Sequence, residues 1–291
     1  MKLVNPKFEE IDISNPLLHG EMCTRVCYKS ENLVKEGSAK KLLTGIAEAG
    51  HTAMLEHIPV YLKLTSWSYS GVVTPLRRIW ESPYTKYEVE DDYEHDLGYM
   101  YISTNLRVVY ENYKELYDAF MEHDGEPFDF NDNTLIRSIK NCKFEDYPDW
   151  FHKRITIKFT MDRIGSQSFC RHRVFSFAQE STRWCNYMKD KFGSEISIST
   201  PCWLKEEDKE EFEKDMQEIE QYYFKWLNKG YKGEEARYFL PFGLKTEIIM
   251  TGFVDAWEHF FALRVDGHAH SQARELAIPL YEYFKEKKYI I

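Results

Sequence analysis

The feature that most constrains the fold is a pair of short runs in which apolar residues alternate with other residues. IPVYLKL (58–64) and ITIKFTM (155–161) follow this period of two, which is typical of a β-strand with one buried face. Because a single strand leaves its backbone hydrogen-bonding groups without partners, we expect the two runs to pair in a small antiparallel sheet. Residues 66–152 lie between them and are rich in tyrosine, glutamate and aspartate. We interpret this segment as one long insertion, with a hairpin over 98–110.

The second half of the chain is expected to be mainly helical. Apolar residues that recur every three or four positions give one acidic helix a buried stripe, formed by Phe212, Met216, Ile219, Tyr223 and Trp226, with Gly230 placed to end it. Further helices are expected over 38–50, 233–240, 247–264 and 271–284. No internal repeat or low-complexity linker divides the chain. These patterns predict an α+β fold: a single mixed domain over residues 1–291, with a helix-rich second half packed on a small antiparallel sheet and the insertion at 66–152.

Composition limits the classes of function. The 291 residues are 43% hydrophobic and 16% aromatic, which is enough for a packed core. The formal net charge of -10 disfavours general binding to nucleic acid or to a membrane surface, because phosphate polyanions repel a negative field. The N-terminal MKLVNPKFEEID lacks the apolar core of a signal peptide, and no run approaches the roughly 18 apolar residues that span a bilayer. We therefore expect a cytoplasmic protein. The six cysteines have no paired CxxC spacing and are interpreted as reduced thiols, so no metal site is expected.

One segment departs from the acidic character of the chain. CRHRVFSFAQESTRWCNY (170–187) concentrates Arg171, His172, Arg173 and Arg183. Three interpretations compete: solvated arginines paired with surplus carboxylates, a single-stranded nucleic-acid patch with interleaved aromatic residues, and a phosphate-binding pocket. The adjacent triplet cannot share one solvent face of a helix, and arginines near apolar surface are best satisfied by an anion. The negative net charge disfavours a polymer, so a compact phosphorylated ligand is the favoured interpretation.

This segment resembles the signature of the flavin-dependent thymidylate synthases, in which an Arg-His-Arg triplet is followed at fixed offsets by Ser, Ser and Arg. The matching residues are Arg171, His172, Arg173, Ser176, Ser181 and Arg183. Three further blocks resemble the family in the same order: HTAMLEH (51–57), EEARYFLPFGLKTEI (234–248) and HFFALRVDGHAHSQARELA (259–277). The resemblance covers about 35–65 and 153–285 and leaves the insertion unexplained.

The resemblance implies a methyltransferase that converts dUMP to dTMP, with methylenetetrahydrofolate as carbon donor, FAD as hydride carrier and NADPH as reductant. It also implies a homotetramer whose active sites draw residues from several subunits. Arg264 would be catalytic, lying against the uracil ring and favouring its ionised form. The residues that the resemblance assigns to FAD are His51, Arg171, His172, Arg173, Gln179, His259 and His268. Those that it assigns to dUMP are Ser168, Arg171, Gln179, Glu180, Ser181, Thr182, Arg183, Arg237 and Arg264.

Some positions depart from the family pattern and keep alternatives open. Ala53 replaces a hydroxyl residue, and Ser168 stands where a longer Gln or Glu often reaches the nucleotide. These departures leave a second function, that of a non-catalytic nucleotide- or flavin-binding relative with a regulatory role. Pro201-Cys202 offers the Pro-Cys pair of cysteine-dependent thymidylate synthases, but that family's surrounding pattern is missing, and Cys202 is interpreted as an ordinary thiol. Taken alone, Arg264 could instead complement a helix dipole.

Overall fold

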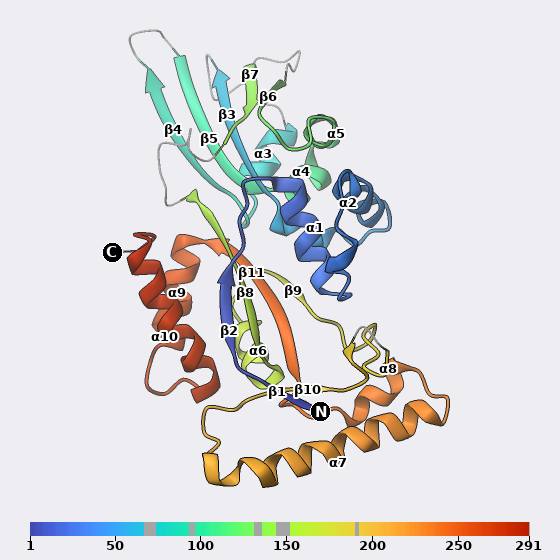
Figure 1. The fold of residues 1–291 in the computed structure, drawn as a ribbon. Helices are drawn as coiled ribbons and strands as arrows, with labels where there is room; N and C mark the ends of the chain where they lie inside the picture. Colours follow the sequence, from blue (N-terminus) through green and yellow to red (C-terminus); the bar gives the residue numbers. More distant parts are fainter. Residues whose placement is uncertain (67–73, 93–96, 131–135, 144–151, 190–191, 291) are drawn as a thin grey trace.

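The computed structural model describes residues 1–66, 74–92, 97–130, 136–143, 152–189 and 192–290. Two antiparallel sheets follow one another along the long axis of the molecule, each with helices beside it, and a long helix lies at one end (Figure 1). None of the helices in these ranges is long and apolar enough to cross a membrane. The mixed α and β fold class predicted from the sequence is confirmed.

The first sheet is antiparallel and has the strand order β2-β8-β11-β9. Its strands are β2 (Lys7–Glu10), β8 (Arg154–Asp162), β9 (Ser176–Gln179) and β11 (Lys245–Phe253). The two central strands, β8 and β11, are buried along nearly their whole length, and Met250 opposite Ile157 is one pair of their register. The helices that accompany this sheet are α6 (Arg163–Phe169), α9 (Val254–Arg264) and α10 (Ser271–Glu286).

The packing of α9 and α10 on the first sheet forms a core rich in aromatic residues. Trp257, Phe260 and Phe284 are fully buried in it, and the indole Nε1 of Trp257 donates to the carbonyl oxygen of Ile155 at 3.2 Å. α9 starts directly after β11 and runs back along the sheet (Figure 1). Its last residue, Arg264, lies beside the end of α6, because its Nη2 donates to the carbonyl oxygen of Ser168 at 2.8 Å.

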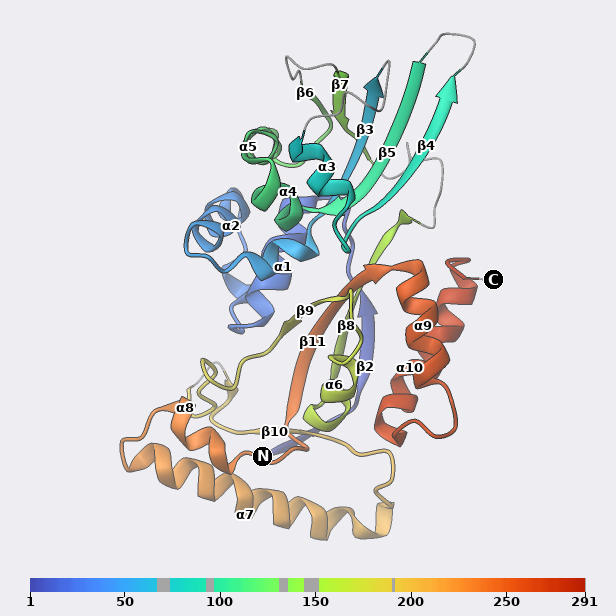
Figure 2. The same cartoon turned by 180° about the vertical axis from the view of Figure 1, so that it is seen from behind.

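The second sheet has the order β4-β5-β3-β7-β6. Its strands are β3 (Pro59–Ser66), β4 (Lys86–Asp92), β5 (Leu97–Asn105), β6 (Phe128–Phe130) and β7 (Ile136–Asn141). Beside it lie α1 (Pro16–Val26), α2 (Ser38–Glu48), the 3-10 helix η2 (Thr52–His57), α3 (Thr74–Trp80), α4 (Leu106–Asn112) and α5 (Lys114–Glu122) (Figures 1 and 2). Leu43, Leu62, Ile102 and Ile139 belong to its buried core.

A third unit closes the end of the first sheet. β1 (Lys2–Val4) pairs in parallel with β10 (Ser197–Ser199), and α7 (Lys209–Asn228) lies across them (Figure 2). The short helices η7 (Glu206–Asp208) and α8 (Gly233–Ala236) also belong to this unit, and α8 continues as η8 (Arg237–Phe239). A further short helix, η1 (Glu31–Leu33), lies in the connection between α1 and α2. The predicted stripe on α7 is confirmed for Tyr223, which is fully buried, and for Phe212, Met216 and Trp226, which pack around it. Ile219, the fifth residue of the stripe, is partly buried but lies outside this cluster. Gly230, with a φ of 93°, follows the helix.

The predicted strand pairing is wrong. β3 lies between β5 and β7 in the second sheet, whereas β8 lies between β2 and β11 in the first. Alternation reports that a strand has two unlike faces, but it does not identify the neighbouring strand. The predicted hairpin over 98–110 is also wrong, because Asn105 ends β5 and caps α4, its side chain accepting from the backbone N of Val108 at 3.1 Å.

Two predicted helices are only partly correct. The range 247–264 divides into β11 and α9, since the run EIIMTGF is buried on both faces and shows no strand alternation. The range 233–240 holds only the short α8 and η8. Residues 66–152 contribute β4 to β7 and α3 to α5, built onto β3. That this segment is an insertion stays a prediction.

Replacing Gly252 by alanine should destabilise the fold, because a Cβ there would lie 2.5 Å from Cε1 of Phe175. The Phe175 ring is itself packed against Trp257, with centroids 4.8 Å apart, so it has little room to move. We expect the free energy of unfolding to fall by about 1–3 kcal/mol, as is typical of overpacking, in denaturant titrations followed by circular dichroism. Gly45→Ala in α2 is the matched control, since nothing lies within 4 Å of its added Cβ. Its stability should stay equal or rise by up to about 1 kcal/mol, and equal losses in both variants would contradict the packing argument.

Candidate functional site

A helix, a tight turn and a strand position the cationic segment. α6 begins after Asp162, whose Oδ1 accepts a hydrogen bond from the backbone N of Gly165 at 2.6 Å. The helix ends at Phe169, and the chain turns through residues 170–174 before β9. Val174 in this turn has a φ of 63°. A β-branched residue adopts this left-handed conformation only where its surroundings hold it there.

The turn separates the three members of the Arg-His-Arg triplet. His172 is buried, whereas Arg171 and Arg173 are exposed. The His172 ring lies 5.0 Å from that of Phe260 and 5.9 Å from that of His259, measured between centroids. Burial, and then the charges of Arg264 and His259, lowers the pKa of His172 to about 4. His172 is therefore neutral near pH 7.

Arg264 connects the triplet to the late helix. Its Nε donates to Nε2 of His172 at 2.9 Å, and its Nη2 donates to the carbonyl oxygen of Ser168 at 2.8 Å. Since Nε2 of His172 accepts, the ring proton is on Nδ1. Burial, and then the nearby charge of Arg171, lowers the pKa of Arg264. Two cations held this close repel each other, and an anion between them would remove the repulsion. We call Ser168, Arg171, His172, His259 and Arg264 the α6–α9 group.

A second group lies after β9 and on α8. Nε of Arg183 donates to Oε2 of Glu234 at 3.1 Å, and Nε of Arg237 donates to the carbonyl oxygen of the same residue at 3.1 Å. One residue of α8 therefore orients both arginines, whose side chains are exposed. Ser181 and Thr182 directly precede Arg183 in the sequence and are partly buried. We call Ser181, Thr182, Arg183 and Arg237 the α8 group.

Gln179 and Glu180, both predicted to bind ligand, are engaged with other side chains of the protein. Nε2 of Gln179 donates to the hydroxyl of Ser166 at 2.8 Å. Glu180 is 2% exposed, and its two carboxylate oxygens accept from the hydroxyl of Tyr187 at 3.0 Å and from Nζ of Lys245 at 2.8 Å. The carboxylate of Glu180 therefore ties β9 to β11 and to the segment that follows β9.

The remaining predicted residues lie apart. His51 is exposed at the start of η2, and His268 is fully exposed after α9, with its Nδ1 2.8 Å from Oδ1 of Asp266. Within the described ranges, no hydrogen bond or ion pair joins the α6–α9 group to the α8 group, and α8 and α9 lie on opposite sides of β11 (Figures 1 and 2). One chain therefore brings together Arg264 and His172, but not all of the predicted residues. No set of three His, Cys, Asp or Glu side chains in the described part of the chain could hold a metal ion.

Sequence reasoning missed a buried row of polar side chains between the sheets. Nδ1 of His57 is 2.8 Å from Oγ1 of Thr251, which is 2.8 Å from Oγ1 of Thr156, which is 3.3 Å from Nε2 of His19. Burial lowers the pKa of His57 to about 3 and that of His19 to about 4. A threonine on a strand and a histidine on a helix have no periodic signature, because the same residues also occur on solvated faces. Only His57, within the block 51–57, gave a sequence signal.

The free energy of unfolding should fall as the pH is lowered from 6.5, the ordinary histidine pKa, toward 4. His19 and His57 have lowered pKa values in the folded chain, so the unfolded chain takes up protons first and stability present above pH 6.5 is lost on acidification. Each should contribute about 1.4 kcal/mol per pH unit within this window, measured by urea unfolding at several pH values. His19→Gln should make the dependence shallower by that amount, whereas His268→Gln, at a fully exposed position, should not. An unchanged slope in His19→Gln would show that the buried ring does not titrate as expected.

The fold and the two groups define an α+β protein with grouped arginine and histidine side chains, residue types that bind anions in many proteins. A family model described as thymidylate synthase complementing protein matches residues 107–288, more than half of the 291 residues. The chain belongs to this family. The match begins inside residues 66–152, so it includes the second part of that segment.

Curated relatives carry the name flavin-dependent thymidylate synthase. The one from Sulfurisphaera tokodaii is 36% identical over 126 residues, 43% of this chain and 48% of its own length. The one from Sulfolobus acidocaldarius is 33% identical over 117 residues, 40% of this chain and 44% of its own length. The chain thus spans about half the length of the curated relatives it matches. A crystal structure of the UMP/dUMP methylase PolB from Streptomyces cacaoi bound with 5-Br dUMP aligns over 98% of this chain and 93% of that one, at 13% identity and a TM-score of 0.42, a likeness too remote to carry an argument.

Proposed function

We propose that this chain is an enzyme that methylates dUMP to dTMP, with methylenetetrahydrofolate as carbon donor, FAD as hydride carrier and NADPH as reductant. Family membership and the names of the curated relatives support the reaction. The observation that carries the proposal is the hydrogen bond between Arg264 and His172, which joins two of the blocks on which the resemblance rests across 92 positions of the sequence.

In this proposal Arg264 acts on the uracil ring. A uracil ring must gain electron density before its carbon can attack an electrophile, so a fixed cation beside the developing oxyanion lowers the barrier. Nε and Nη2 of Arg264 are held by His172 and Ser168, which leaves Nη1 for a ligand among the described contacts. His172 is neutral and accepts from Arg264, so it orients the guanidinium without adding a second charge.

The FAD assignment rests on the cations of the α6–α9 group. FAD, when bound and reduced by NADPH, would supply the hydride, and its phosphates would accept hydrogen bonds from the exposed Arg171. Burial, and then the charge of Arg171, lowers the pKa of Arg264, and an anion bound to Arg171 would lessen the second of these effects. The residues proposed to hold FAD are His51, Arg171, His172, Arg173, Gln179, His259 and His268.

The dUMP phosphate is proposed to bind at the α8 group, where Arg183 and Arg237 are exposed and share Glu234. Ser168, Arg171, Gln179, Glu180, Ser181, Thr182 and Arg264 complete the proposed dUMP set. Because the two groups lie on opposite sides of β11 in one chain (Figure 1), we further propose a homotetramer in which one site takes residues from more than one copy. Arg183→Ala and Arg264→Ala, each inactive alone, should then partly restore activity when mixed.

The test uses the full chain. Purified protein should have a flavin absorbance spectrum and should form dTMP when given dUMP, methylenetetrahydrofolate and NADPH. Omitting either methylenetetrahydrofolate or NADPH should abolish the product, and adding a thiol-alkylating reagent should not, since no cysteine is required. Bound flavin without product would instead favour the nucleotide- or flavin-binding relative.

A further inference from the structure

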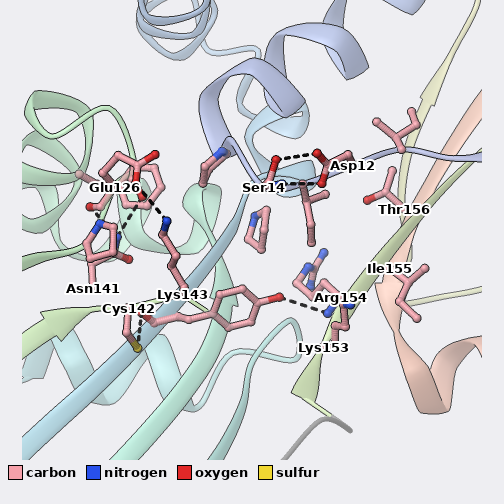
Figure 3. A pocket seen from close by; sticks show the side chains of 18 of the residues that line it. Asp12, Ser14, Glu126, Asn141, Cys142, Lys143, Lys153, Arg154, Ile155 and Thr156 are labelled. Carbon is pink, nitrogen blue, oxygen red and sulfur yellow. Dashed lines mark hydrogen bonds and ion pairs between the residues drawn. The ribbon is translucent and has the colours of Figure 1, made fainter. Parts of the chain in front are cut away.

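A cavity of about 480 Å³ lies between the two sheets (Figure 3). Its walls come from the start of β8, the start of β3, the end of β7, and the connections that precede α1 and follow α5. Sites for small organic molecules usually have volumes of about 300–1,000 Å³. Among the described lining residues there is none that we propose to bind FAD or dUMP. The cavity is therefore a separate feature of the molecule.

Arg154 lines this cavity and is fully buried. Its Nη2 donates to the carbonyl oxygen of Glu56 at 3.1 Å and to the hydroxyl of Ser176 at 3.2 Å, and its Cζ lies 5.0 Å from the centroid of the Phe253 ring. Its Nε and Nη1 have no hydrogen-bond partner among the described residues. Buried polar groups are almost always hydrogen-bonded, so two N–H groups of one guanidinium without an acceptor require an explanation.

The charge of Arg154 is also poorly compensated. The carboxylate whose charge acts on it is that of Glu56, and this carboxylate already forms an ion pair with Arg107. Burial lowers the pKa of Arg154 to about 10, so the guanidinium keeps its charge near pH 7 while losing its hydration. A desolvated cation of this kind is stabilised by an anion that also accepts its hydrogen bonds.

The acidic residues of the wall already have donors of their own. The Oδ2 atom of Asp12 accepts from the hydroxyl of Ser14 at 2.6 Å. Glu126 forms an ion pair with Lys143 at 3.6 Å, and the carboxylate of Glu10 accepts from two tyrosine hydroxyls at 2.8 and 2.9 Å. Figure 3 shows Lys143 on the side of β7 and Arg154 on the side of β8, facing the same space. Among the described residues, none of these carboxylates accepts from Nε or Nη1 of Arg154.

We infer that this cavity binds a small organic anion, whose carboxylate or phosphate group accepts hydrogen bonds from Nε and Nη1 of Arg154. The apolar side chains of Ile11, Phe120 and Ile155 also line the space. The carbon part of an organic ligand would bury this apolar surface, whereas an inorganic ion would not. Arg154 also bonds Ser176, the first residue of β9. An anion bound to Arg154 would therefore lie close to β9, the strand whose last residue is Gln179.

Binding is tested by isothermal titration calorimetry of the full chain with three probes: benzoate, phenyl phosphate and inorganic phosphate. We expect benzoate or phenyl phosphate to bind in the millimolar range or tighter, and inorganic phosphate to bind more weakly. A preference for benzoate identifies a carboxylate site, and a preference for phenyl phosphate a phosphate site. Arg237→Ala, which alters the proposed dUMP site, should leave this binding unchanged. The absence of binding by both organic probes would overturn the inference.

Variants then assign the binding to Arg154. Arg154→Gln keeps a polar side chain and removes the charge, so it should weaken the affinity by about 10- to 100-fold. Because a change at a fully buried position can impair folding, a second variant is needed. Ser14→Trp alters an exposed residue at the cavity wall and should block entry while Arg154 remains. Wild-type affinity in a folded Arg154→Gln, or in Ser14→Trp, would show that the probes bind elsewhere.

Discussion

Arg264→Ala is expected to lower the rate of dTMP formation by at least about 100-fold, the loss typical of removing one charge that stabilises a developing oxyanion. Flavin should remain bound, because His172 and the exposed arginines of the triplet are untouched. The measurement is turnover with dUMP, methylenetetrahydrofolate and NADPH, together with the flavin absorbance of the purified variant. The dUMP dissociation constant should change much less than the rate.

Arg264→Lys is the matched control for charge. A lysine keeps the positive charge but has no planar fork, so it cannot bond both His172 and the carbonyl oxygen of Ser168 as the guanidinium does. We expect turnover between those of the wild type and the alanine variant. Turnover near the wild-type rate in Arg264→Ala would remove the proposed catalytic role, and loss of flavin would reassign the residue to cofactor binding.

Glu180→Ala is expected to lower the free energy of unfolding by about 3 kcal/mol. The change removes the acceptor of the Tyr187 hydroxyl and of Lys245, whose side chain is only 15% exposed. Lys245 retains an ion pair with Glu247 at 3.3 Å, which limits the loss. Thermal unfolding followed by circular dichroism should show a midpoint lower by on the order of 10 °C.

Glu234→Ala provides the comparison with an exposed ion pair. Its partner Arg183 is 59% exposed and Glu234 itself is 40% exposed, and ion pairs of this kind contribute only about 0–1 kcal/mol. We therefore expect Glu234→Ala to unfold close to the wild type while weakening the orientation of Arg183. If the two glutamate variants lost the same stability, the buried contacts of Glu180 with Tyr187 and Lys245 would contribute no more than an exposed ion pair.

The elements that the sequence predicted well are those with a local cause. The stripe of α7 repeats within one helix, and Tyr223 is buried where the period requires. Strand partners were predicted wrongly, because β3 and β8 have similar patterns but belong to different sheets. The choice between neighbours depends on contacts far apart in the sequence.

In the candidate site, too, local sequence motifs were predicted, whereas contacts between residues far apart in the sequence were not. The resemblance, and not any periodicity, led to both Arg264 and His172, which the structure joins by a hydrogen bond. The resemblance did not indicate that the carboxylate of Glu180 accepts a hydrogen bond from Lys245, because that contact joins residues 65 positions apart. Arg154 had no signal at all, since a single arginine at the start of a strand is typical of an exposed strand end.

The left-handed backbone at Val174 bears on attempts to engineer the protein. Glycine or asparagine would occupy that conformation with less strain, so a search for thermostable variants would select them first. Yet glycine would loosen the backbone of the turn 170–174, and this turn carries Arg171 and Arg173, two arginines proposed to bind FAD. A programme of stabilisation should therefore keep position 174 fixed and take its gains from surfaces remote from this bend.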